Sequence, residues 1–112
     1  MTARYEERKK TSMATYVMLT RLSPDAIADP STIDQLGQTV IDKLNAECPE
    51  AKWIASYAVL GPYDYLDLFE APDNETAAKV AVIVRSFGHA TTETWPITPW
   101  ERFREVLHSM GD

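Results

Sequence analysis

The alternation of hydrophobic and polar residues predicts four strands and three helices. The strand-like runs are rich in aromatic and β-branched residues and are bounded by Pro or Gly. Residues with this character cover 15–22, 53–60, 65–70 and 91–97. Apolar residues at helical spacing occupy 32–48 and 74–87, and a short final helix follows the last strand. The predicted order is therefore β-α-β-β-α-β followed by one helix.

Turn and capping residues separate these elements. Gly61 and Pro62 lie between the second and third runs and predict a hairpin with a short loop. Residues 32–35 and 98–101 both have the pattern of a capping box, which marks a helix start. Gly88 is the expected end of the second helix.

This order is that of an α+β, ferredoxin-like fold, in which both helices cover one face of a four-stranded antiparallel sheet. Strand alternation places a second group of apolar side chains on the other face. They are Tyr16, Met18, Tyr57, Val59, Tyr65 and Phe69. Because a large uncovered apolar face is a liability, we expect a second copy of the chain to cover it as a homodimer.

Composition and charge narrow the function classes. The 112 residues suit one domain, and the net charge of −6 argues against nucleic acid or a membrane surface as partners. Residues 1–12 hold four basic and two acidic side chains. We expect them to be a flexible extension before a domain at 13–112, the alternative being a basic arm for an acidic partner.

The remaining sequence signals favour a cytoplasmic protein without a bound metal or cofactor. No signal peptide or membrane-length apolar run is visible. The lone cysteine, Cys48, excludes an internal disulfide and a cysteine-based zinc site. It falls on the apolar stripe of the first helix, so we expect it to be buried. No phosphate-binding loop or hydrolase elbow is present.

Several short motifs resemble the GYD-domain family. Gly61-Pro62-Tyr63-Asp64 is similar to its signature, and Glu70-Ala71-Pro72-Asp73 to the acidic-Ala-Pro-Asp stretch that follows. Gly88 with Thr92-Glu93-Thr94 is similar to its glycine-then-strand ending. The resemblance runs from about residue 14 to 97. It implies a dimeric α/β barrel, in which two sheets close face to face, and it implies no particular reaction.

Asp67 is the main candidate for chemistry. It lies in the middle of the third strand, on the face expected to line the barrel, where desolvation raises a carboxyl pKa. His89 and Glu93 would point the same way from the fourth strand and form a proton-transfer site with Asp67. The alternative is structural: Asp67 hydrogen-bonded in a polar dimer core, His89 solvated and Glu93 paired with a basic neighbour.

Two hypotheses for function follow. In the first, a homodimeric barrel binds a small, partly apolar molecule, with Asp67 and His89 as catalytic groups if the protein is an enzyme. The side chains expected to contact that molecule are Tyr16, Tyr57, Tyr65, Phe69, Glu93 and Trp95. In the second, the protein is a non-catalytic assembly or sensing module with a filled barrel. In both, Gly61, Tyr63 and Asp64 are expected to fix the turn.

Overall fold

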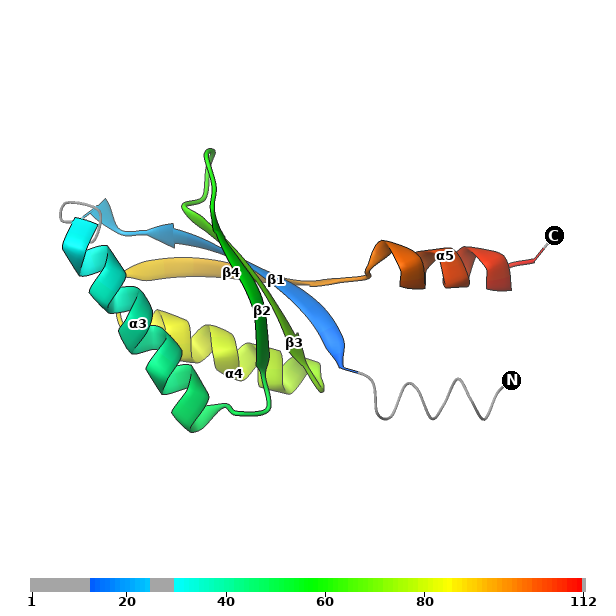
Figure 1. Cartoon of the computed structure of the whole chain (residues 1–112), viewed down its shortest axis with the longest axis horizontal. Helices are drawn as coiled ribbons and strands as arrows, with labels where there is room; N and C mark the ends of the chain where they lie inside the picture. Colours follow the sequence, from blue (N-terminus) through cyan, green and yellow to red (C-terminus); the bar gives the residue numbers. More distant parts are fainter. Residues whose placement is uncertain (1–12, 25–29, 112) are drawn as a thin grey trace.

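The chain folds in the predicted order, β-α-β-β-α-β with a terminal helix (Figure 1). The structure, a computed structural model, describes residues 13–24 and 30–111. The predicted extension at residues 1–12 lies outside this part. The elements are β1 (Ala14–Leu22), α3 (Pro30–Glu47), β2 (Lys52–Ala58), β3 (Tyr65–Ala71), α4 (Asn74–Arg85), β4 (Ala90–Ile97) and α5 (Trp100–Ser109).

The four strands form one antiparallel sheet in the order β2-β3-β1-β4. This is the ferredoxin-like arrangement that the sequence predicts. β3 lies inside the sheet, between β2 and β1, and β4 is an edge strand. Pro96 has no amide hydrogen to give to a ladder, so its place on an edge strand is the expected one.

The core lies between one face of this sheet and the helices α3 and α4, which Figure 1 shows on the same side of the sheet. Tyr16, Met18 and Phe69 belong to this core and are at most 3% exposed. Strand alternation predicted these three residues on the uncovered face, and that prediction was wrong. Both faces of β1 are apolar, so alternation alone does not show which face the helices cover.

The other face of the sheet is covered by none of the described helices, and we call it the open face. Strand register defines it, because residues directly opposite each other point to the same side. Leu19 lies opposite Leu66 and Glu93. The open face carries Val17, Leu19, Tyr57, Leu66, Leu68, Glu93, Trp95 and Ile97.

A β-bulge accounts for the position of Tyr57. Trp53 pairs with Phe69 on the helix-covered face, but the register shifts before Ala55, which pairs with Leu68 on the open face. The extra residue of a bulge reverses the alternation of the strand beyond it. Strict alternation would put Trp53 and Tyr57 on one face of the strand, and the bulge places them on opposite faces.

The helix starts differ from the predicted ones at two places. α3 begins at Pro30 rather than Thr32, which is acceptable because proline tolerates the first turn of a helix. α5 begins at Trp100 after Pro99, without a side-chain cap, so the predicted capping box at 98–101 is absent. At α4 the N-cap is Asp73, whose carboxylate accepts a hydrogen bond of 2.8 Å from the Thr76 amide.

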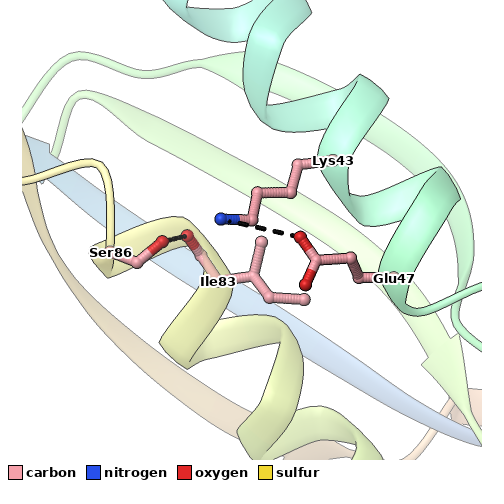
Figure 2. Close-up of polar contacts among 4 residues, drawn as sticks. All are labelled: Lys43, Glu47, Ile83 and Ser86. Atoms are coloured by element: carbon pink, nitrogen blue, oxygen red, sulfur yellow. Dashed lines mark hydrogen bonds and ion pairs between the residues drawn. The ribbon is translucent and has the colours of Figure 1, made fainter.

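The C-terminal half of α3 is held against α4. Lys43 forms a 3.5 Å ion pair with Glu47, and its ammonium lies 5.4 Å from the centre of the Phe87 ring. Figure 2 shows this pair beside α4, where the Ser86 hydroxyl donates 2.6 Å to the Ile83 carbonyl. Cys48, directly after α3, is 1% exposed, as predicted. The N-terminal half of α3 is less buried than this end.

The last helix, α5, extends beyond the end of the sheet (Figure 1). Every residue of it is exposed, including the apolar side chains Trp100, Phe103 and Leu107. A helix with an uncovered apolar stripe is typical of an interaction surface. Among the residues that the structure describes, no helix is long and apolar enough to cross a membrane.

Candidate functional site

A pocket of about 330 Å³ lies between the helix-covered face of the sheet and the N-terminal half of α3. We call it the sheet–α3 pocket. Its lining is mainly apolar. Besides two tyrosines, the polar side chains of the lining are those of Thr20, Ser56, Asp67 and His89. Its apolar and aromatic lining includes Met18, Leu22, Ile33, Leu36, Val40, Ile41, Trp53, Tyr65, Val84 and Phe87. An apolar cavity of this size with a few polar groups is the usual form of a small-molecule site.

Gly37 contributes to the space in this pocket. It lies on the same helical stripe as Ile33 and Ile41, four residues from each, so it leaves a side-chain position of that stripe empty. A methyl group built at Gly37 would meet no atom within 4 Å. The apolar stripe alone predicts a packed core at this place and no pocket. A glycine at a stripe position in mid-helix was the signal that could have revealed it.

Asp67 lies in the pocket, half-buried on the middle of β3. It faces α3 and not the open face, so its predicted place inside a two-sheet barrel is corrected. Burial raises the pKa of this carboxyl, while hydrogen bonds with Ser56 and Trp53 act in the opposite direction. The Trp53 indole in turn donates 2.9 Å to the Ser56 hydroxyl. Asp67 is therefore a partly desolvated acid with neutral hydrogen-bond partners.

The raised pKa of Asp67 predicts that this residue destabilises the fold at neutral pH. The folded state keeps the Asp67 proton to a higher pH than the unfolded chain does. The free energy of unfolding therefore falls as the pH rises above 3.8, the ordinary pKa of an aspartate side chain. The loss is complete above the folded-state pKa. We expect Asp67→Asn to raise stability at pH 7 by about 1 kcal/mol, or a few degrees in Tm.

Thermal unfolding at several pH values tests this expectation. The stability difference between Asp67→Asn and the wild type should shrink as the pH is lowered toward 4. Asp34→Asn, on an exposed position of α3, serves as the control with no gain expected. An Asp67→Asn protein that is less stable than the wild type at pH 7 would show that the carboxylate forms a net stabilising interaction.

His89 also lines the pocket but lies far from Asp67. Asp67 pairs with Met18 of β1. The His89 carbonyl accepts a hydrogen bond from the amide of Ser23, which follows Met18 by five residues along the chain. At about 3.3 Å per residue, the two backbone positions are separated by roughly 16 Å. The side chains of Asp67 and His89 are too short to meet across that distance. The structure therefore does not form the direct proton-transfer pair that the sequence analysis predicted.

Glu93 belongs to a different cluster, on the open face. Its carboxylate accepts 2.5 Å from the Tyr63 hydroxyl and 3.2 Å from the Trp95 indole. The Arg21 guanidinium lies 5.4 Å from the centre of the Tyr63 ring. The hydrogen bond to Glu93 raises the pKa of Tyr63. Glu93 and Trp95 are thus brought together, but the sheet separates them from Asp67.

The motif at residues 61–64 fixes the hairpin to the rest of the sheet. Gly61 has a φ of +150°, a conformation that residues with a side chain rarely adopt. The Asp64 carboxylate accepts 2.7 Å from the Leu22 amide at the end of β1, and the Pro62 carbonyl accepts 2.7 Å from Arg21. Asp64 was expected to fix the turn, and the amide that its carboxylate binds lies outside the hairpin. The partner is a different strand.

Loss of the Asp64 carboxylate should weaken this connection. Asp64→Ala leaves the Leu22 amide without its partner, and such a loss costs about 1–3 kcal/mol when the group is partly buried. Urea unfolding measures the change, and amide hydrogen exchange should accelerate at Leu22. Asp64→Asn keeps an acceptor oxygen and should lose less. Unchanged exchange at Leu22 in the alanine variant would contradict the assigned role.

The remaining predicted contact residues divide between core and pocket. Phe69 is fully buried, and the Tyr16 hydroxyl donates 2.6 Å to the Asn74 side chain at the start of α4. Neither lines the pocket. Tyr65 and Tyr57 do, although strand register places Tyr57 opposite Leu66 on the open face, and burial raises the pKa of Tyr65. Within the described ranges, no three His, Cys, Asp or Glu side chains lie close enough together to hold a metal ion.

Comparison with known proteins identifies the family and the fold. The family model of the GYD domain matches residues 16–107. A Thermus thermophilus protein named "Glutamine synthetase and cystathionine beta-lyase binding protein" is 30% identical over 91 residues, which cover 78% of this chain and 90% of that protein.

Two solved structures share the fold at low sequence identity. One is the Mycobacterium tuberculosis leucine response regulatory protein LrpA, with a TM-score of 0.54 and 14% identity over 83% of this chain. The other is LrpC of B. subtilis, with a TM-score of 0.53 and 15% identity over 84% of this chain. The chain spans about half the length of each, 55% and 56%.

Proposed function

This chain belongs to the GYD-domain family, and we propose that it is a homodimeric protein that binds a small, largely apolar molecule in the sheet–α3 pocket. The observation that carries the proposal is the pocket itself, about 330 Å³ of mainly apolar space with the Asp67 carboxyl in its wall. Pockets of this volume are large enough for small ligands. The site differs from the first expectation, because it lies within one copy of the chain and not between two sheets.

The open face supports the homodimer. Its exposed apolar side chains lie on the two edge strands, where Tyr57, Trp95 and Ile97 are 55%, 49% and 37% exposed, whereas Leu19 at its centre is 8% exposed. A second copy related by a two-fold axis would cover this face with the same face of its own sheet. The result would be an α/β barrel with the two sheet–α3 pockets on its outside.

Any acid–base chemistry in the pocket would rest on Asp67. A carboxyl whose pKa burial raises is suited to exchange a proton nearer neutral pH than an exposed one. His89 is too far from Asp67 to act as its direct partner. The geometry therefore supports binding more strongly than catalysis.

Filling the pocket tests the proposed binding. Gly37→Phe places a ring where the helix has open space, and a glycine in mid-helix can be replaced without loss of helix propensity. Native mass spectrometry of freshly purified protein should show a retained ligand in the wild type, and loss of that ligand in Gly37→Phe. Gly37→Ala is the control, since a methyl group leaves most of the space. A ligand retained equally by all three proteins would place the binding site elsewhere.

A second candidate function is the binding of a partner enzyme. Two observations favour it: the name of the Thermus thermophilus relative, and the uncovered apolar stripe of α5. The stripe consists of Trp100, Phe103, Leu107 and Met110, with Val106 beside it. In this function α5 would dock on an enzyme such as glutamine synthetase or cystathionine beta-lyase.

Direct binding measurements separate this candidate from the first. Surface plasmon resonance should detect a complex of this chain with the glutamine synthetase or the cystathionine beta-lyase of the organism that makes it. Phe103→Glu should abolish it, whereas Glu101→Gln, on the polar side of α5, should not. Absence of binding to both enzymes, or equal binding of the Phe103→Glu protein, would contradict this function.

A further inference from the structure

The charges around the sheet–α3 pocket indicate what kind of molecule it takes. Of the described residues that line the pocket, Asp67 is the one acid, and none is Lys or Arg. His89 is the remaining titratable base in the lining, and its side chain is exposed and lies some distance from Asp67. As far as the described residues show, the pocket therefore presents a half-buried carboxyl with no lysine or arginine in its lining.

The contacts of Asp67 leave its negative charge uncompensated. Its hydrogen-bond partners, Ser56 and Trp53, are neutral groups. No ion pair to Asp67 is formed by the described part of the chain. The ionised form of a buried carboxyl group is strongly favoured over the protonated form when an opposite charge comes within a few ångströms. A ligand with a positive charge would supply the opposite charge that the described residues do not place beside Asp67.

Aromatic rings in the lining add to this preference. Trp53 comes from the neighbouring strand β2, Tyr65 from β3 itself, two residues before Asp67, and Phe87 follows α4. The faces of such rings attract cations through their quadrupoles. Phe87 already does so within the protein, where the Lys43 ammonium lies 5.4 Å from its centre. Lys43 itself is paired with Glu47 on α3, so its charge is balanced away from Asp67.

We infer that the sheet–α3 pocket binds an organic cation, a molecule with an ammonium group on an apolar body. The ammonium group lies against Asp67, and the body occupies the space between Met18 on β1 and the Gly37 turn of α3. A carboxylic acid of the same size is rejected, because its charge would face that of Asp67. This inference rests on the proposed binding function and gives the chemical class of its ligand.

Three probes of equal length test the inference: n-hexylamine, n-hexanol and hexanoate. The amine is protonated at pH 7, as the lysine side chain is. Isothermal titration calorimetry on the full-length protein should give the tightest binding for the amine, weaker binding for the alcohol and the weakest for the acid. Asp67→Asn should weaken amine binding by about tenfold or more, since it removes one member of a charge pair. The same change should leave alcohol binding nearly unaltered.

The outcomes distinguish the two levels of the proposal. If the wild type binds none of the probes, both the pocket's binding function and the cation inference are overturned. If hexanol or hexanoate binds as tightly as hexylamine, the pocket remains a binding site and the cation inference is overturned. The same holds if Asp67→Asn, shown by circular dichroism to be folded, binds hexylamine as the wild type does. Gly37→Phe should reduce binding of all probes.

Discussion

Replacement of Phe69 with alanine is expected to remove about 3–5 kcal/mol of folding stability, the range for large aromatic side chains deleted from a core. Phe69 is completely buried at the centre of the core. Its ring stacks between those of Tyr16 and Trp53, with centroids 5.4 Å and 5.2 Å away. A domain of this size has a total stability of roughly 5–15 kcal/mol. Urea unfolding followed by circular dichroism should show a large loss of the folded state.

Phe69→Leu is the matched comparison, because it keeps an apolar side chain of intermediate size. We expect it to lose less than half of what the alanine variant loses. If Phe69→Ala lost less than about 1 kcal/mol, the ring could not be at the centre of the core. That result would restore the first expectation, in which Phe69 lies on the face away from the helices.

The second large effect concerns the proposed homodimer. Trp95→Glu places a charge on the open face, on the edge strand β4 and opposite Val17 of β1. A tryptophan buried in an interface commonly contributes about 2 kcal/mol or more, so we expect dissociation to be favoured by about 30-fold or more. Light scattering over a concentration series should show the wild type at twice the 12.6 kDa chain mass and the variant near the chain mass.

Val82→Glu provides the control for this experiment. Val82 is also an exposed apolar residue, 57% accessible, but it lies on α4, away from the open face. The mass of the Val82→Glu protein in solution should remain that of the wild type. A wild-type protein that is monomeric at tens of micromolar would contradict the homodimer. A Trp95→Glu protein that remains dimeric would place the interface on another surface.

The fold was predictable from sequence because local signals agreed with one another. Aromatic and β-branched runs, the Gly61 turn and the Asp73 cap each marked a boundary within a few residues. The order of the elements then restricted the topology to a few choices. The side of the sheet that the helices cover was not predictable. β1 is apolar on both faces, and the bulge in β2 reverses the alternation there.

The candidate site was predictable only in part. Asp67 was recognised because a carboxylate in the middle of an apolar strand is unusual, and this residue does lie in a pocket. The pairing of Asp67 with His89 and Glu93 depended on strand register and on faces, which spacing along the chain does not give. The gap that Gly37 leaves in the apolar stripe of α3 is visible in the sequence, but whether a neighbouring element fills that gap depends on how the helix packs against the sheet.

The most direct test of the central claim is to locate a bound molecule by methyl NMR. Nuclear Overhauser contacts from n-hexylamine should reach the methyl groups of Ile33, Leu36 and Val84, which line the sheet–α3 pocket. The account predicts no contacts to Val17 or Leu68, on the opposite face of the sheet. Contacts to those two residues, without contacts to the three pocket residues, would place the ligand between two sheets and contradict the account.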